Sequence, residues 1–257
     1  MRKENRVGER KIMNCGEECE IIEYRKAVDI TVKFIKTNEL IKSTYNNFKK
    51  GEIKSHFTPS VYSAGIIGLE KTLDGEGKHL KSYEIWHNML QRCYDERYKE
   101  KHPTYKECTV CDEWKFYKNF KDWYEENYYE MDNQHMTLDK DILAKENKIY
   151  SPETCVFVPQ NINSLFTKSD AKRGEYPIGV DWHKANQVYQ TRCRVFNVKT
   201  LKNNSKYLGC YNTPQEAFNA YKKTKEENIK QVADYYKDRI PSKLYDAMYK
   251  YEVHIDD

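Results

Sequence analysis

Residues 137–166, TLDKDILAKENKIYSPETCVFVPQNINSLF, constrain the fold more than any other stretch of the chain. Their pattern indicates a strand, a loop, a second strand and a helix, and so predicts a short hairpin packed on a helix. Asp139 and Asp141 lie near the end of the first strand, and Asn161 and Asn163 open the helix. Such a hairpin can bring a strand carboxylate and a helix amide to one divalent ion. These oxygen ligands suit Mg²⁺ or Mn²⁺, the ions that assist phosphodiester cleavage.

Each half of this pattern also has an ordinary structural explanation. An Asp-Lys-Asp run is usual at a solvated strand end, and Asn at the start of a helix is usually a cap. Taken alone, each half is therefore more often structural than functional.

At 257 residues the chain can hold one large domain or two to three small ones. Its 39% hydrophobic and 33% charged residues predict modest cores under a heavily solvated surface. No apolar run approaches the roughly 20 residues of a membrane span, and the N-terminus MRKENRVGERK lacks the apolar stretch of a signal peptide. We therefore expect a cytoplasmic protein without membrane contact, whose cysteines are reduced.

The pattern predicts an α+β, multi-domain chain. Residues 1–68 form a small β-rich module in which residues 20–36 alternate well enough for two strands joined by a turn. Residues 69–81 are expected to be a linker, and the polar run SDAKRGEY at 169–176 a connector. Two further domains, residues 82–168 and 177–257, complete the chain.

Charge differs between these parts. Residues 1–81 carry a net charge of +4, residues 82–174 of −3 and residues 175–257 of +3. A slightly acidic centre between basic ends suits a metal-dependent site flanked by modules that grip DNA. Chance variation in a solvated surface explains the charges equally well.

The central part combines helical and strand patterns. Ser82 is expected to cap a helix, because apolar residues recur after it at helical spacing. A short strand, ECTVCDEW, follows, and Phe116, Phe120 and Trp123 indicate a second amphipathic helix. The hairpin and helix described above end this part.

In the C-terminal part, three strands are predicted in IGVDWHK, VYQTRCRVF and SKYLGCY, before a long helix. The start of that helix is marked by Thr213 as N-cap, Pro214 at the first helical position and Glu216 closing a capping box. A short helix, SKLYDAMYKY, ends the chain.

The run from Trp86 to Asn163 resembles phage HNH endonucleases of the homing type. The matching motifs, in the family's order, are WHNMLQRCYDERY, YKECTVCDEW, FKDW, LDKDI and YSPETCVFVPQNIN. The resemblance implies a ββα-metal hairpin that holds one Mg²⁺ or Mn²⁺ through Asp139 and Asn163, with Asn161 as a less favoured substitute. It implies an enzyme that hydrolyses phosphodiester bonds in double-stranded DNA, in the host cytoplasm if the chain is phage-encoded.

The chain departs from this family where a His next to the Asp is expected as general base, because Lys140 stands there. Lys140 would need a strongly lowered pKa to act as a base, or it could stabilise charge on the phosphate. Asp141, His135 or a metal-bound hydroxide would then handle the proton. The alternative is a catalytically decayed HNH fold that binds DNA or a protein, as a regulator or as an inhibitor of a host defence nuclease.

Residues 177–236 resemble the ethylene-response-factor (apetala-type) DNA-binding domain. The match lies in Gly179-Val180, in Leu208-Gly209 with the aromatic residue and Thr213 that follow, and in Glu216-Ala217 with Ala220-Tyr221. The resemblance implies a three-stranded sheet in the DNA major groove with the helix packed behind it. Asp181 departs from the family, which usually has a basic residue there.

Between Trp182 and Tyr207 the chain has six basic residues and no acidic one. Arg192 and Arg194 alternate on one strand and so face the same side, where one could reach guanine while lysines hold phosphates. We expect DNA contacts from Trp182, Lys184, Arg192, Arg194, Lys199, Lys206 and Tyr207. An ordinary solvated basic sheet is the structural alternative.

Cys108 and Cys111 form a CxxC, but a structural zinc site needs four ligands. The other close pair, Cys15 and Cys19, lies in a different module, so we expect buried thiols and no structural zinc. In the N-terminal module, phosphate contacts by its lysines, protein binding and a purely structural role all stay open. A homodimer and a host protein partner also stay open.

Overall fold

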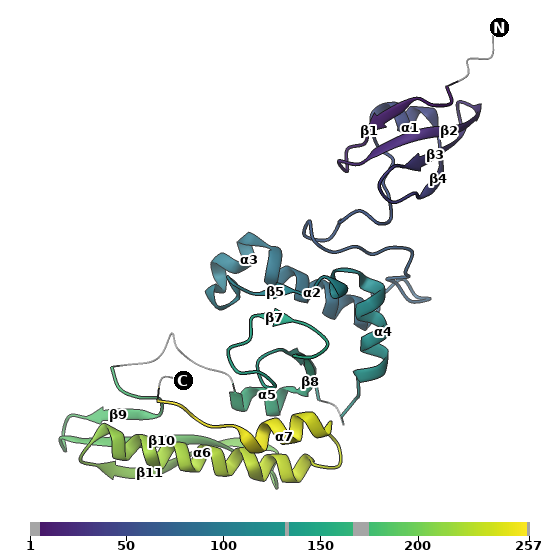
Figure 1. The fold of residues 1–257 in the computed structure, drawn as a ribbon. Coiled ribbons are helices and arrows are strands. Elements are labelled where there is room, and N and C mark those ends of the chain that lie inside the picture. The colour runs from purple at the N-terminus through teal and green to yellow at the C-terminus, as the bar shows by residue number, and fades with distance from the viewer. Residues whose placement is uncertain (1–5, 132–133, 167–174, 256–257) are drawn as a thin grey trace. The chain divides into compact units, whose positions relative to one another are not determined.

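The computed structural model describes residues 6–131, 134–166 and 175–255 (Figure 1). Helices and several separate sheets make the fold α+β. The chain divides into two compact units, the first ending at Glu126 and the second beginning at Asn127. The 137–166 hairpin thus belongs to the same unit as the C-terminal sheet, and residues 169–174 of the predicted connector lie outside the described residues. No helix within the described ranges is long and apolar enough to cross a membrane.

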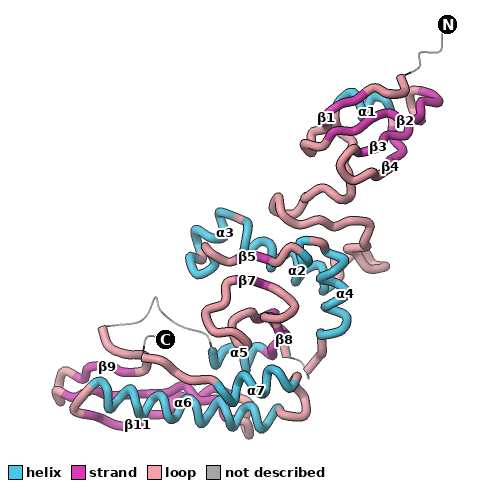
Figure 2. Tube along the Cα trace, in the orientation of Figure 1, coloured by secondary structure: helices cyan, strands magenta, loops and turns pink. Residues whose placement is uncertain are grey.

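A four-stranded antiparallel sheet opens the first unit (Figure 2). In sheet order its strands are β1 (Arg10–Ile12), β2 (Glu18–Lys26), β3 (Asp29–Phe34) and β4 (Leu40–Ser43). Successive side chains of a strand point to opposite faces, so one face is apolar. Its buried members are Cys19, Ile21, Ile30, Val32 and Phe34. The two strands predicted within residues 20–36 are confirmed.

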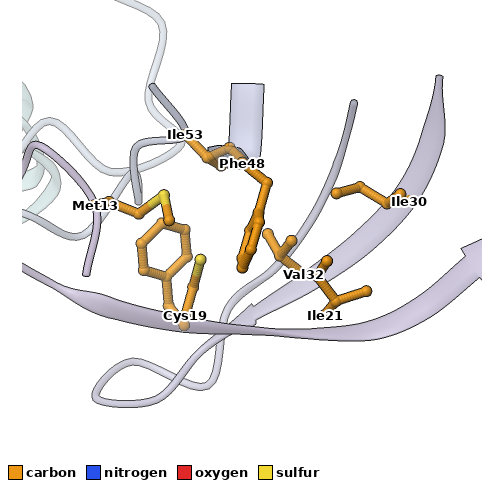
Figure 3. Packing of buried hydrophobic residues seen from close by; sticks show 8 residues of the cluster. Met13, Cys19, Ile21, Ile30, Val32, Phe48 and Ile53 are labelled. Carbon is orange, nitrogen blue, oxygen red and sulfur yellow. The ribbon is translucent and has the colours of Figure 1, made fainter. Parts of the chain in front are cut away.

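Helix α1 (Tyr45–Lys50) covers this apolar face with the ring of Phe48 (Figure 3). The Thr44 side chain caps the helix by accepting from the backbone N–H of Asn47, and Gly51 ends it in the left-handed conformation at φ 73°. The module is therefore a small sheet with its own core.

The rest of the first unit is mainly helical. It contains α2 (Lys81–Tyr94), α3 (Glu96–Lys101), β5 (Thr109–Val110), all but the last residue of α4 (Tyr117–Asn127), and the 3₁₀ turns Pro103–Tyr105 and Glu113–Lys115. The prediction that Ser82 caps α2 was wrong, because Leu80 is the N-cap. Ser82 is buried within the helix, and its hydroxyl lies 2.8 Å from the hydroxyl of Tyr117. The serine oxygen therefore joins α2 to α4.

The second unit begins with the hairpin. Strands β6 (Met136–Asp139) and β8 (Val156–Pro159) pair antiparallel, β7 (Ile149–Tyr150) lies in the loop between them, and α5 (Gln160–Phe166) follows directly. Ile162 and Leu165 are buried one helical turn apart, and α5 packs on both strands. The predicted order of strand, loop, strand and helix is confirmed.

A three-stranded antiparallel sheet with a long helix completes the second unit (Figure 1). The strands β9 (Val180–His183), β10 (Val188–Asn197) and β11 (Lys202–Tyr211) lie in the order β11-β10-β9. Helix α6 (Pro214–Tyr236) packs on this sheet, and α7 (Ser242–Lys250) packs on α6. The capping box of Thr213 and Glu216 forms as predicted.

Gly179 allows the sheet and α6 to approach closely. Its φ is +76°, and a Cβ atom there would lie 2.2 Å from the ring of Tyr221 on α6. Its carbonyl accepts from the hydroxyl of Thr191 at 2.6 Å and from the backbone N–H of Arg192 at 3.2 Å. A side chain at this position would therefore meet both backbone strain and overlap.

We predict that Gly179→Ala lowers the free energy of unfolding of the second unit by about 2–4 kcal/mol, the sum of left-handed strain and overpacking. Denaturant titration of the full chain measures this effect. Gly75→Ala is the matched control, because a Cβ at Gly75 meets nothing within 4 Å. Equal midpoints for the two variants would contradict the packing described for Gly179.

Candidate metal centre and nucleic-acid interface

The hairpin places Asp139 at the last position of β6. Its Oδ1 accepts hydrogen bonds of 2.8 Å from the backbone N–H groups of Asp141 and Ile142, which close the turn after the strand. Burial raises the pKa of the Asp139 carboxyl above its ordinary value, although these two hydrogen bonds act in the opposite direction. Within the described residues this carboxylate has no ion pair. A bound cation would therefore stabilise its charged form.

Lys140 is buried and points into the loop that follows. Its Nζ donates to Oδ1 of Asp141 at 2.5 Å and to the carbonyl of Asn147 at 2.9 Å. The Asn147 amide donates back to the carbonyl of Lys140 at 2.9 Å and to that of Ile149 at 2.7 Å. These hydrogen bonds show that Lys140 closes the loop. Its role as a base or as a stabiliser of phosphate charge stays a prediction.

His135 lies at the other end of β6 from Asp139. Its carbonyl accepts from the backbone N–H of Gln160 at 2.9 Å, which fixes the start of α5 to the strand. Four steps of about 3.3 Å put His135 roughly 13 Å from Asp139 along the strand. The structure therefore does not bring His135 close to Asp139. Asp141, which is exposed, lies only two residues after Asp139 in the chain.

The two helix amides have different surroundings. The Asn161 amide donates to the hydroxyl of Tyr236 on α6 at 2.6 Å, and the Gln134 amide donates to the same hydroxyl at 3.3 Å. Because residues of an α-helix are about 100° apart, Asn163 lies roughly 200° around α5 from Asn161. Asn161 is thus used to hold α5 to α6, and Asn163 lies on the other flank. The preference for Asn163 as a ligand stays a prediction.

Further contacts hold the hairpin against α6 and the chain around α7. The Lys243 ammonium donates to the carbonyl of Cys155 at 3.2 Å. The rings of Phe166 and Tyr251 meet edge to face, with centres 4.8 Å apart. Tyr236 itself is fully buried. These residues were not predicted from the sequence as parts of the site. The helical spacing of Val232 and Tyr236 indicates burial, but nothing in it indicates the partner.

One face of the β9–β11 sheet is covered by α6, and the opposite face is here called the outer face. Cys193 on β10 is buried with Phe218 of α6. Arg192 and Arg194 flank Cys193 and are exposed, so they point outwards. Arg192 pairs with Tyr207 on β11, and its guanidinium carbon lies 5.7 Å from the centre of that ring. The prediction that both arginines share one side is confirmed.

Two of the residues expected to contact DNA lie on the face covered by α6. Trp182 pairs with Tyr189, whose ring centre lies 4.7 Å away and which packs against the core beneath α6. Lys206 pairs with the buried Cys193. Cross-strand partners share a face of the sheet. Neither residue therefore lies on the outer face with the two arginines. Their placement does not support the DNA contacts expected of Trp182 and Lys206.

Lys184 and Lys199 are exposed beyond the strand ends. Lys184 follows β9, and Lys199 lies in the turn between β10 and β11. These turns lie at opposite ends of β10, so the two lysines flank the outer face. Ammonium groups there are suited to phosphate contacts.

Within the part of the chain that the structure describes, no group of three or more His, Cys, Asp or Glu residues could hold a metal ion. Cys108 is buried, as expected, whereas Cys111 is half-buried. A centre built from Asp139 and Asn163 is a different donor set. It fits Mg²⁺, which binds through one or two protein oxygens and completes its shell with water and phosphate oxygens.

Comparison with protein-family models, with curated proteins and with solved structures finds no match for this chain.

We predict that Mn²⁺ or Mg²⁺ stabilises the native chain but not Asp139→Asn. The variant can retain the turn hydrogen bonds to Oδ1 while losing the charge that attracts the cation. At a free ion concentration 100 times Kd, the native chain should gain about 2.7 kcal/mol in free energy of unfolding. Unfolding with the ion and with a chelator measures the difference. Asp246→Asn on α7 is the control, and ion-dependent stabilisation of Asp139→Asn equal to the native gain would exclude this centre.

Asn161→Ala and Asn163→Ala should have opposite effects. Asn161→Ala removes the 2.6 Å hydrogen bond to Tyr236, so the free energy of unfolding without ion should fall by about 1–3 kcal/mol while the ion effect persists. Asn163→Ala should weaken the stabilisation by Mn²⁺ with a smaller change in its absence. The same unfolding experiment separates the two. The reverse pattern would assign the ligand role to Asn161.

Proposed function

We propose that this protein is a metal-dependent DNA endonuclease of the HNH type, in which the β9–β11 sheet positions double-stranded DNA. The observation that carries the proposal is the Asp139 carboxylate. It is held at the end of a hairpin by two backbone N–H groups, and burial disfavours its charge. A cation bound there offsets that cost, and Mg²⁺ or Mn²⁺ is the cation that suits oxygen ligands.

Asp139 and Asn163 are the residues that would hold the ion. When bound, the ion would stabilise the charge that develops on the phosphate and on the leaving 3′-oxygen. The hairpin turn orients the Asp139 carboxylate, and α5, the helix that carries Asn163, packs on the same strands. Asp141 is exposed next to this carboxylate, so it is the group proposed to accept the proton from water. Lys140 orients Asp141 through their 2.5 Å contact.

Tyr236 links the proposed cleavage site in the hairpin to the sheet that is proposed to bind DNA. Its hydroxyl joins α5 to α6 through the Asn161 amide, and α6 packs on the sheet that carries Arg192 and Arg194. A site held in this way should cut DNA at a fixed distance from the sequence that the sheet binds.

A second candidate is a non-cleaving protein with the same scaffold, which binds DNA or another protein. Two observations favour it: Lys140 is buried in the position of the expected base, and His135 lies at the far end of β6. Retention of Asp139 and Asn163 argues for the enzyme.

In a plasmid-cleavage assay with Mg²⁺ or Mn²⁺, Asp139→Ala should reduce the rate by about 100-fold or more, the scale of removing one group that stabilises developing charge. Asp246→Ala should cut like the native chain. DNA binding is measured in parallel by mobility shift. Intact binding without cutting by the native chain under either ion would favour the non-cleaving candidate.

Arg192→Ala and Arg194→Ala should each weaken the affinity for a bound duplex by about 10-fold, because a bidentate contact between arginine and guanine contributes about 1–3 kcal/mol. Lys230→Ala, on the exposed surface of α6, is the control. Titration by mobility shift at moderate salt measures the change. Unchanged affinity in both arginine variants would remove the sheet from the DNA interface.

A further inference from the structure

The outer face of the sheet consists of cross-strand rows with different chemistry. Gln190 pairs with Asp181 on β9 and with Cys210 on β11, which defines a first row. The next row pairs Arg192 with Tyr207, and the one after it pairs Arg194 with Ser205. The basic rows and the first row therefore lie side by side on one surface.

Asp181 points outwards with Gln190. Its neighbour Val180 is buried in the core beneath α6, and its other neighbour Trp182 packs on Tyr189. Alternation along β9 then places the Asp181 carboxylate on the outer face, where the residue is exposed. In the described portion of the chain this carboxylate has no ion-pair partner. An unpaired acid on a DNA-binding face weakens non-specific attraction to phosphates.

The major groove provides a specific partner for such an acid. A carboxylate only accepts hydrogen bonds, and the amino groups of cytosine and adenine are the donors that the groove presents. Guanine and thymine present acceptors, which repel a carboxylate. A glutamine side chain in the same row can bond adenine through two hydrogen bonds. The first row thus favours cytosine or adenine and disfavours guanine or thymine.

The rows are fixed relative to one another. The hydroxyl of Tyr207 lies 3.0 Å from the sulfur of Cys210, which links the second row to the first, and Arg192 lies over the ring of Tyr207. Residues two positions apart on a strand are about 6.7 Å apart. That spacing is close to two base-pair rises of about 3.4 Å.

We infer that Asp181 and Gln190 determine specificity: on the strand whose bases the sheet contacts, cytosine or adenine lies about two base pairs from a guanine. The arginine rows contact the guanine, and the first row contacts the amino group of the neighbouring base. This inference rests on the proposed function of the sheet in DNA binding. In this inference Asp181 determines which base is bound and does not increase the affinity for DNA.

Selection of duplexes from a random library with the full chain tests the inference, followed by titration of the selected duplex and of its single-base variants. The native chain should prefer cytosine or adenine at the first-row position by about 10- to 100-fold over guanine or thymine. Asp181→Asn should shift the preference towards adenine, because asparagine bonds that base through two hydrogen bonds. Gln190→Ala should reduce the preference for cytosine or adenine at the first-row position and leave the preference for guanine at the arginine position unchanged. Glu227→Gln on α6 is the control.

Thermal unfolding confirms that each variant is folded. Native base preferences in Asp181→Asn and Gln190→Ala would overturn the inference and leave DNA binding by the sheet intact. If the native chain selects no duplex sequence, the proposed sequence-specific binding by the sheet fails, and the inference fails with it. The two failures are therefore distinguishable.

Discussion

The organisation of the second unit depends on the hydroxyl group of Tyr236. This buried hydroxyl accepts hydrogen bonds from Asn161 at the start of α5 and from Gln134 before β6. The helix that carries it, α6, packs on the three-stranded sheet. One helix therefore holds both the hairpin with Asp139 and the sheet with the outer arginines. A buried hydroxyl that lost these partners would destabilise the attachment, so the proposed cleavage and DNA-binding sites share one support.

The hairpin combines a loop closed by hydrogen bonds with a carboxylate, Asp139, whose charged form is disfavoured by burial. Lys140, Asp141 and Asn147 close the loop through hydrogen bonds between 2.5 and 2.9 Å. Asp139 remains outside this network, with a pKa that burial raises. Function commonly retains such a group even though it lowers stability. In the proposed nuclease, Lys140 would therefore support the loop, and Asp141 is the group proposed to accept the proton.

Local patterns predicted the elements well, because strand alternation and helix capping depend on near neighbours. The capping box of Thr213 and Glu216 and the hairpin order are examples. Contacts between segments far apart in the chain could not be predicted from these patterns. Asn161 and Tyr236, for example, are 75 residues apart. Lys206 and Tyr207 are adjacent on β11 and must face opposite sides, but which of them faces outwards depends on the register with β10. That register shifts between Thr191 and Arg192, which no periodicity indicates.

The most direct test of the central claim is the position of a bound cation. Crystals of the full chain grown with Mn²⁺ would locate the ion by its anomalous scattering. One peak is expected within coordination distance of a carboxylate oxygen of Asp139, on the side of α5 that carries Asn163. A fully occupied Mn²⁺ elsewhere in the chain, with none at Asp139, would contradict the claim.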